Sequence, residues 1–437
     1  MSPDQKARSP ELDGRARNPP EARPAVPFDH HSMEYSREPW RVHAQLRNES
    51  PVAWTEAHGG FWVLNRADDI ARVARDDVTF SARHDLENDG RSYTGITIPE
   101  AAAFLMPPAE VDPPETGFYR RLINRRLSPV AVARLESTVR RLTSWCLNRH
   151  VASGAIDLVL DLANPVAAMT TMHLMGLPLK QWRIWAEPLH ASNSTPRGSP
   201  ERAAAEQGMR LLGERLSATI ESQRRGPKRG LIGDLLNARV DGQPLSDDIL
   251  FGLCFIVIGG GVDTTTGLLA AAFDHLDRHP GDRRTLIEDP TRIPAAGEEF
   301  LRFFTPAPNN VRTATRDTEI GAIRIRKGER VLLCWGAANH DPEHFSEPDR
   351  VIIERFPNRH LAFGLGAHRC VGSTLARTMF RIVLQSVLES LPDYTLDRKH
   401  VALYEDRGHI AGYCRLPANF TPPRAGFRNR AARARGD

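Results

Sequence analysis

The chain has 437 residues, 41% of them hydrophobic and 26% charged, which is the ordinary composition of a globular protein. Its formal net charge is +4, and the C-terminal stretch Pro422–Asp437, with five arginines and one aspartate, carries all of it. Because the rest of the chain is close to neutral, the composition argues against a nucleic-acid partner.

The two ends of the chain and its cysteines indicate the bounds of the folded domain and the redox environment of the protein. Residues 1–27 contain six prolines and lack the apolar core of a secretory signal, so they predict a disordered leader. Residues 422–437 predict a disordered basic tail, which leaves a single domain over residues 28–421. Five scattered cysteines with no CxxC pair give no support to a zinc ribbon or a thioredoxin-type motif, and their odd number indicates a reducing, cytoplasmic setting.

The first predicted elements are strands, and a long helical region follows. The stretch Pro51–Asn65 predicts a β-hairpin that turns at its two adjacent glycines. From about Pro129 to Pro280 apolar residues recur at helical spacing, and Ser128 followed by Pro129 is typical of a helix N-terminus. The polar, proline-containing stretch Ala191–Glu201 interrupts this pattern and predicts a loop.

The longest apolar run, Ile249–Val262, lies within the helical region. Its 14 residues are too few to cross a bilayer, so no membrane anchor is expected. Farther along, alternation over Thr318–Gly336 predicts two or three strands. Because helices and strands are segregated along the chain, we expect a mainly α fold with small β sheets rather than a doubly wound sheet.

One cysteine has unusual neighbours. Cys370 follows Gly364 and Gly366 and precedes Gly372, and glycines leave room for a flat group to approach the backbone. A helix is predicted just after Cys370, and a helix N-terminus together with Arg369 would favour the thiolate and lower the pKa of the thiol. Such a thiolate can be a nucleophile, a redox thiol or a metal ligand, although most free cysteines are buried and inert.

The residues around this cysteine resemble the haem-binding loop of the cytochrome P450 family, FGxGxHxCxGxxLAR. The matching residues are Phe363, Gly364, Gly366, His368, Cys370, Gly372, Leu375, Ala376 and Arg377. The resemblance implies that Cys370 is the axial thiolate ligand of haem iron, that Phe363 packs against the ligand loop and that His368 binds a haem propionate. The amides that follow the cysteine, where Gly372 lies, would hydrogen-bond the sulfur.

A second motif resembles the ExxR motif of the same family. Glu299 and Arg302 are spaced i, i+3 on one predicted helical face, where an ion pair can form. Arg355 would be the third member of this network. The resemblance implies a structural role for all three residues, close to the haem loop.

A third motif, Gly260-Gly261-Val262-Asp263-Thr264, resembles the oxygen-binding helix of the family, (A/G)GxDT. Glycines cost a helix about 1 kcal/mol each relative to alanine, and we explain them by the close approach of a flat cofactor. A phosphate-binding GxGxxG loop does not fit, because Thr264 stands where its third glycine would fall. The resemblance implies that Asp263 relays protons and that Thr264 orders oxygen and water in the pocket.

Two arginines complete the expected cofactor site. Arg120 follows a DPPE stretch that resembles the DPPEH…R segment of the family, and Arg312 matches a second propionate-binding arginine. Arginine suits this role because its guanidinium binds a carboxylate with two hydrogen bonds. Thr116 stands where this segment of the family usually has a histidine.

On these motifs the chain is identified as a member of the cytochrome P450 family, with a single triangular domain. The resemblance implies a monooxygenase that uses haem b and O₂ to hydroxylate a hydrophobic natural product of terpenoid, steroid or polyketide type in secondary metabolism. Electrons would come from NAD(P)H through a ferredoxin and a ferredoxin reductase. Basic residues expected to meet an acidic ferredoxin are Arg125, Arg126, Arg359, Arg369 and Arg377. The expected protein is a cytoplasmic monomer.

The substrate pocket is expected to be apolar with a few polar groups. Its candidate lining residues are Ile256, Gly259, Asn309, Asn310, Val311, His409 and Ile410. Two alternatives stay open: the same fold could catalyse oxidative coupling, cyclisation or desaturation, or the chain could be a haem sensor or carrier without catalytic activity. The acid–alcohol pair Asp263–Thr264 argues against a carrier, which needs no proton relay.

Overall fold

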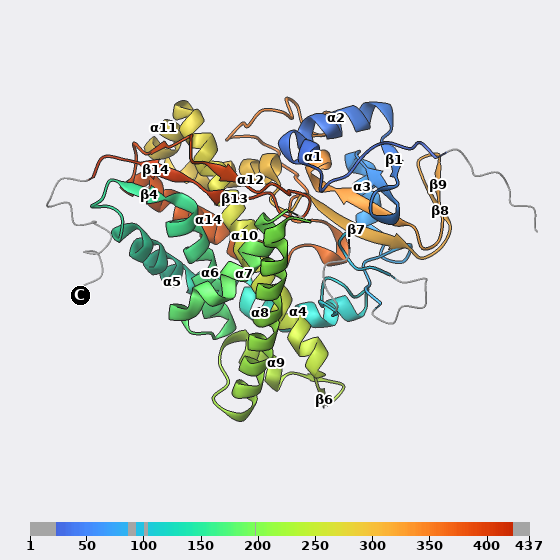
Figure 1. Ribbon diagram of the computed structural model, residues 1–437, viewed down its shortest axis with the longest axis horizontal. Helices are drawn as coiled ribbons and strands as arrows, with labels where there is room; N and C mark the ends of the chain where they lie inside the picture. The colour runs from blue at the N-terminus through green and yellow to red at the C-terminus, as the bar shows by residue number, and fades with distance from the viewer. Residues whose placement is uncertain (1–22, 86–92, 100–103, 197, 423–437) are drawn as a thin grey trace, which may run out of the picture.

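The computed structural model describes residues 23–85, 93–99, 104–196 and 198–422. In Figure 1 helices occupy the left and the centre and the largest sheet lies on the right, which gives the molecule a triangular outline. The predicted fold class, mainly α with small β sheets, is confirmed.

The helices and strands follow one another along the chain as in Figure 1. The α-helices are α1 (Met33–Arg37), α2 (Pro39–Glu49), α3 (Ala67–Arg75), α4 (Glu115–Leu127), α5 (Pro129–Asn148), α6 (Asn164–Met175), α7 (Trp182–Ser194), α8 (Pro200–Arg225), α9 (Gly230–Asn237), α10 (Asp247–Arg278), α11 (Pro280–Glu288), α12 (Ile293–Phe304), α13 (Trp335–Asn339) and α14 (Ser373–Ser390). The strands are β1 (Val52–Thr55), β2 (Phe61–Leu64), β3 (Phe80–Ser81), β4 (Ala155–Asp157), β5 (Arg239–Val240), β6 (Gln243–Pro244), β7 (Asn309–Ala314), β8 (Thr318–Ile320), β9 (Ile323–Ile325), β10 (Arg330–Cys334), β11 (Thr395–Leu396), β12 (Ala402–Leu403), β13 (Tyr413–Arg415) and β14 (Pro417–Asn419).

The largest sheet brings together strands from early and late parts of the chain. Its order is β1-β2-β10-β7-β3, with β2 and β10 parallel and the other neighbours antiparallel. The predicted hairpin is confirmed, since Val52 pairs with Leu64 and the two glycines at the turn take φ of 82° and 90°. The strands predicted over residues 318–336 are β8, β9 and β10.

Two serines begin long helices as their sequence context suggests. The hydroxyl of Ser128 accepts a hydrogen bond from the backbone N–H of Ala131 at the start of α5, and Pro129 fills the first position. Ser246 caps α10 in the same way. The loop predicted over residues 191–201 is shorter than expected, because α7 continues to Ser194 and α8 begins at residue 200.

The central helix α10 is much longer than the apolar run that predicted it. It spans 32 residues, and the hydroxyls of Thr264 and Thr266 donate to carbonyls four residues earlier, so these polar residues do not end it. By length and composition it is the one helix among the described residues that could cross a membrane. It packs against α6 and α14 in the larger of two hydrophobic cores.

The predicted boundary of the leader is wrong. Ala25 pairs with Trp54 at the edge of the sheet, and Arg23 forms an ion pair with Glu329 at 2.5 Å. Residues 23–27 are therefore part of the fold, because the edge strand β1 offers them unpaired backbone groups. Residues 1–22, and all of the predicted tail except Pro422, lie outside the described residues.

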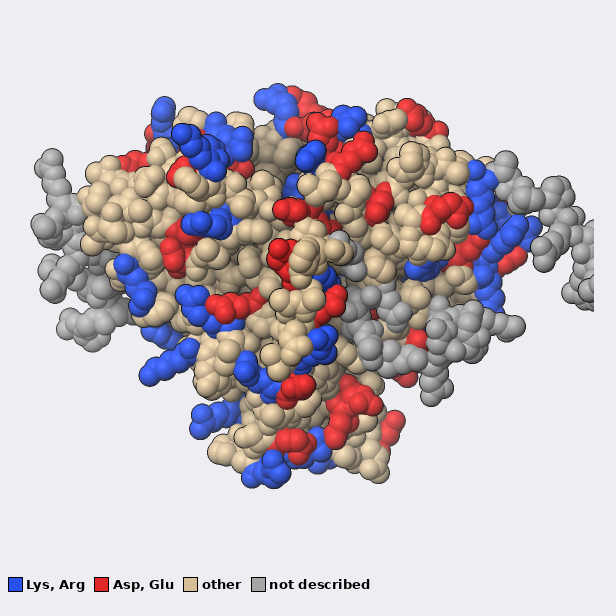
Figure 2. Space-filling view, in the orientation of Figure 1, with Lys and Arg blue, Asp and Glu red and all other residues tan. Residues whose placement is uncertain are grey.

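Charged side chains are mixed over the face of the molecule that Figure 2 shows. Acidic and basic groups lie among one another across this face, and its described part carries no continuous basic surface. This distribution agrees with the near-neutral charge of the chain outside its tail.

A buried ion-pair network ties α12 to the segment that leads to Cys370. Arg302 donates to both carboxylate oxygens of Glu299 at 2.8 Å, and neither side chain is exposed. Arg302 also donates to three backbone carbonyls between residues 339 and 350. Arg355 donates to Glu299 at 3.1 Å, so the expected third member of the network is confirmed.

We expect Arg302→Ala to lower the free energy of unfolding by about 3–5 kcal/mol, because it takes the bidentate partner from a buried carboxylate. Denaturant titration followed by circular dichroism measures the loss. The matched control is Arg41→Ala, which removes an i,i+3 pair with Glu38 whose side chains are 59% and 58% exposed. That variant should lose less than about 1 kcal/mol. Similar losses in the two variants would contradict a structural role for the buried pair.

Candidate active site

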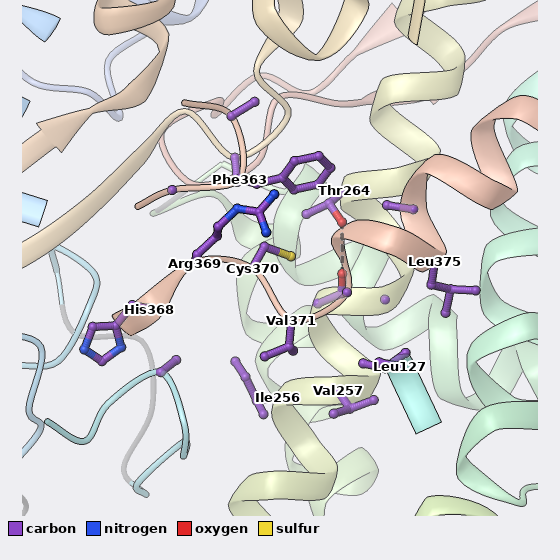
Figure 3. A pocket seen from close by; sticks show the side chains of 18 of the residues that line it. Leu127, Ile256, Val257, Thr264, Phe363, His368, Arg369, Cys370, Val371 and Leu375 are labelled. Atoms are coloured by element: carbon purple, nitrogen blue, oxygen red, sulfur yellow. Dashed lines mark hydrogen bonds between the residues drawn. The ribbon is translucent and has the colours of Figure 1, made fainter. Parts of the chain in front are cut away.

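A cavity of about 310 Å³ lies between α10 and the loop that precedes α14. Cys370 opens onto it from the loop, and Gly260, Gly261 and Thr264 line it from α10. Figure 3 shows Cys370 and Thr264 in the same part of the cavity, with Phe363 beside them. Two motifs far apart in the sequence therefore meet at one site.

The loop that carries Cys370 is held by hydrogen bonds and a cation–π contact. The backbone N–H of Cys370 donates to the carbonyl of Phe363 at 2.8 Å, and the guanidinium of Arg377 lies 4.5 Å from the centre of the Phe363 ring. Glu298 anchors Arg377 through two hydrogen bonds of 2.7 Å. Gly366 takes φ of 69°, a conformation that favours glycine.

The pKa of the Cys370 thiol is raised rather than lowered. Burial raises it, and the backbone N–H of Gly372 and the charges of Arg120 and Arg369 offset this effect only in part. The expected lowering of the pKa does not hold for the protein alone, because α14 begins only at Ser373 and desolvation outweighs the neighbouring donors and charges. A metal ion at the sulfur would reverse this balance, since a coordinating thiol is deprotonated outright.

Arg120, Arg312 and His368 line the cavity, as predicted. Nε of Arg312 and both ring nitrogens of His368 are buried without a hydrogen-bond partner among the described residues, although the carbonyl of Pro108 lies near the imidazole. The carboxylate of Asp77 lies 3.8 Å from Nε2 of His368. Burial lowers the pKa of His368 to about 3 and that of Arg312 to about 10. Unsatisfied polar atoms destabilise a fold, so this set indicates a site for a polar group.

The expected acid and alcohol lie on different sides of α10. Thr264 faces the cavity, and its hydroxyl donates to the carbonyl of Gly260 at 2.9 Å (Figure 3). Asp263 does not line the cavity and is 1% exposed. Asn193 donates to its Oδ2 at 2.6 Å, and Nδ1 of His190 lies 3.3 Å from its Oδ1. Asp263 is therefore held toward α7.

Tyr404 completes the polar cluster around Asp263. Its hydroxyl lies 2.8 Å from Nδ1 of His190, and burial raises the pKa of that hydroxyl. The side chain of His190 is 16% exposed, so it connects the buried acid to the outside. No sequence signal could have identified these partners, because α7 and the residue after β12 are both far from Asp263 in the chain.

Two of the seven residues expected in the substrate pocket line the cavity. Ile256 and Asn310 line the cavity, and Asn310 also accepts a hydrogen bond from Trp335 at 2.9 Å. The residues that do not line it are Gly259, Asn309, Val311, His409 and Ile410. Asn309 and Val311 miss it because neighbouring residues of a strand point to opposite faces of the sheet. Leu301 and Trp335 line it as well, although no motif identified them.

The basic surface expected to meet a ferredoxin is smaller than predicted. Arg126 and Arg377 form ion pairs with carboxylates, and Arg369 lines the cavity. Arg125 and Arg359 are exposed. Neighbouring acidic groups, which the sequence pattern did not reveal, neutralise part of the predicted charge.

Comparisons with known proteins agree with the site. A family model described as Cytochrome P450 matches residues 202–392. Cytochrome P450 130 of Mycobacterium tuberculosis is 31% identical over 83% of this chain and 90% of that protein. Linalool 8-monooxygenase of Pseudomonas putida is 32% identical over 79% of this chain and 87% of that enzyme. The solved structure of a P450 EryK mutant in complex with erythromycin B has a TM-score of 0.79 and 30% identity, and covers 90% of this chain and 98% of its own.

The two adjacent glycines of α10 make a matched pair for testing the cavity wall. A Cβ on Gly261 would lie 2.5 Å from Oγ1 of Thr171, whereas a Cβ on Gly260 would meet nothing within 4 Å. We expect Gly261→Ala to lower the free energy of unfolding by ~1–3 kcal/mol through overpacking. Gly260→Ala should leave it unchanged or raise it by up to about 1 kcal/mol through helix propensity. Denaturant titrations measure both, and equal effects would contradict this placement of the glycines.

Proposed function

The chain belongs to the cytochrome P450 family of monooxygenases, and we propose that it uses a haem held by Cys370 to hydroxylate a hydrophobic small molecule. The observation that carries this proposal is the meeting of Cys370 and Thr264 at one cavity, beside the unpartnered polar atoms of Arg312 and His368. The substrate class we propose is a natural product of terpenoid, steroid or polyketide type, made in secondary metabolism.

The residues around the cavity fit a haem group. Cys370 would hold the haem iron through its sulfur, and the N–H of Gly372 lies close enough to that sulfur to favour the thiolate. A Cβ on Gly260 would meet nothing within 4 Å, so α10 is open to a flat ring at that residue. The residues proposed to bind the two propionates are Arg120, Arg312 and His368. The unpartnered atoms of Arg312 and His368 gain a partner when carboxylates bind, which is the physical reason for the fit.

Bound haem supplies the activation of O₂, and the protein must deliver protons to it in a dry cavity. Thr264 is the proposed donor on the cavity side, since its hydroxyl is bonded to the carbonyl of Gly260 and can turn toward a ligand. Asp263 is the proposed source of those protons. Delivery requires the Asp263 carboxyl group to leave Asn193 and His190 and turn toward the cavity.

The substrate side of the cavity is apolar. Ile96, Ile256 and Leu301 contribute aliphatic walls, and Asn310 is one of its polar groups. Such a surface selects for hydrophobic ligands with few polar groups. The linalool monooxygenase and the erythromycin B complex support a terpenoid or macrolide-like substrate for this chain.

The proposal also includes the source of electrons, the cellular location and the oligomeric state. We place the protein in the cytoplasm as a monomer that receives electrons from NAD(P)H through a ferredoxin and its reductase. Arg125 and Arg359 are the exposed cations proposed to meet an acidic partner.

We expect the reduced, CO-bound holoprotein to show the strongly red-shifted Soret band of a thiolate-ligated haem. Cys370→Ser should abolish this band, because serine does not supply a thiolate. Cys414→Ser is the matched control, since Cys414 is partly exposed and does not line the cavity. Absorption spectra of freshly prepared protein decide the matter: a histidine-type band in the wild type would contradict Cys370 as the ligand.

We expect Thr264→Ala to lower the product formed per NAD(P)H by roughly 10- to 100-fold and to raise hydrogen peroxide, because proton delivery is impaired. Thr266→Ala is the control, since Thr266 makes the same i−4 hydrogen bond but does not line the cavity. A substrate for the assay comes from screening terpenoids, steroids and macrolides for a spin-state shift of the haem. Unchanged coupling in Thr264→Ala would contradict the proposed role.

Product mass tests the reaction type in the same assay. Hydroxylation adds one oxygen atom to the substrate, whereas coupling, cyclisation or desaturation removes hydrogen. A product that has lost hydrogen and gained no oxygen would overturn the hydroxylase proposal while leaving Cys370 as the haem ligand.

A further inference from the structure

Four histidines gather outside the cavity, where the N-terminal segment meets the turn before β2 and the loop before β13. They are His30, His31, His58 and His409. The ring centroid of His31 lies 4.1 Å from that of His30, 5.5 Å from that of His58 and 4.7 Å from that of His409. The proposed reaction makes no use of this cluster.

Two of these histidines converge on one backbone carbonyl next to the cavity. Nε2 of His30 lies 2.9 Å and Nε2 of His31 lies 2.8 Å from the carbonyl oxygen of Ile98. Ile98 is completely buried, and Ile96, two residues earlier, lines the cavity. The histidines therefore hold the short segment that supplies part of the cavity wall.

The hydrogen bonds of His31 require it to be charged. Its Nε2 faces the carbonyl of Ile98, and its Nδ1 lies 2.8 Å from both carboxylate oxygens of Asp406. A neutral imidazole has only one N–H, so only the imidazolium can donate to both acceptors. His30 differs, because its Nδ1 is buried with no partner among the described residues. Burial and the neighbouring histidines lower the pKa of His30, which keeps it neutral.

Two carboxylates close to His31, those of Asp29 and Asp406, favour a positive charge on its ring. Asp29 accepts a hydrogen bond from the backbone N–H of His31 at 2.8 Å, and Nε2 of His58 lies 2.9 Å from the same oxygen of Asp29. Burial by itself would raise the pKa of Asp406, but the hydrogen bond and charge of His31, with smaller contributions from the backbone N–H of Gly408 and from His409, lower it below the usual value.

The loop that carries Asp406 is packed closely on the cluster. A Cβ on Gly408 would lie 2.6 Å from Nδ1 of His31, so only glycine permits this approach. Asn309 donates to the carbonyl of Gly408 at 3.0 Å, and Arg407 donates to the carbonyl of Ser36 at 3.2 Å. The partner of His31 is thus fixed from two sides.

We propose that charged His31, paired with Asp406, is a positioning residue that holds Ile96 in the cavity wall through the carbonyl of Ile98. The protonated ring makes two hydrogen bonds, and loss of its proton removes one of them. The wall is therefore held by both histidines only while the His31 ring carries both protons. Protonation of Asp406 at low pH breaks the pair from the other side.

Optical titration of the holoprotein with two azoles tests this inference. This readout, unlike the inference itself, rests on the proposed haem cavity. Clotrimazole is large enough to contact the wall, whereas imidazole needs little more than the iron. At about pH 6 we expect His31→Gln to bind clotrimazole ~10-fold more weakly than the wild type, with imidazole affinity unchanged.

His58→Gln is the matched control, because His58 belongs to the cluster but bonds Asp29 and does not contact Ile98. It should leave the affinity for both azoles unchanged. Asp406→Asn is the second variant, in case His31→Gln does not fold, and it should show the same selective loss. Equal weakening of both azoles, or an unchanged affinity for clotrimazole in both variants, would overturn the proposal.

A measurement that does not involve haem separates this inference from the proposed function. In ¹⁵N spectra of histidine-labelled protein at about pH 6, both ring nitrogens of His31 should be protonated, with the signal assigned by its absence in His31→Gln. A neutral His31 ring at that pH would overturn the inference whatever the cavity binds. A protein that fails to bind haem but shows the imidazolium would instead count against the proposed function alone.

Discussion

The buried carboxylate of Glu299 is the interaction on which the rest of the site depends. A buried charge is destabilising unless cations and donors surround it, and Glu299 receives Arg302, Arg355 and the backbone N–H of Ile352 at 2.8 Å. Apart from Arg302, these partners belong to the segment that leads to the Cys370 loop. The need to satisfy one carboxylate on α12 therefore fixes where that loop starts, and the place of the cysteine follows from it.

The opposite side of the cavity depends on the geometry of a single helix. Successive residues of an α-helix point about 100° apart, so Asp263 and Thr264 cannot both face the cavity. The alcohol lines the cavity, and the acid lies among His190, Asn193 and Tyr404 on the far side of α10. This division keeps the carboxylate of Asp263 out of an apolar space. Rotation of that one side chain would carry it from the outer side of α10 to the cavity.

Two histidine–carboxylate contacts lie behind the cavity rather than in it, His190–Asp263 and His31–Asp406. Both link segments that are distant in the chain. The first holds a proposed proton donor, and the second holds the segment of Ile96. Groups outside the cavity thereby hold residues on two sides of it.

The sequence by itself determined the family, the main elements and the residues of the two facing motifs, because each of these depends on neighbours within a few positions. The i,i+3 spacing of Glu299 and Arg302, the cap at Ser128 and the glycine pattern around Cys370 are local features of this kind. The tertiary structure alone decided the partners of Asp263, the strand face that turns Asn310 and not Asn309 to the cavity, and the direction in which the pKa of Cys370 shifts. These depend on burial and on groups brought from distant segments, which no local pattern encodes.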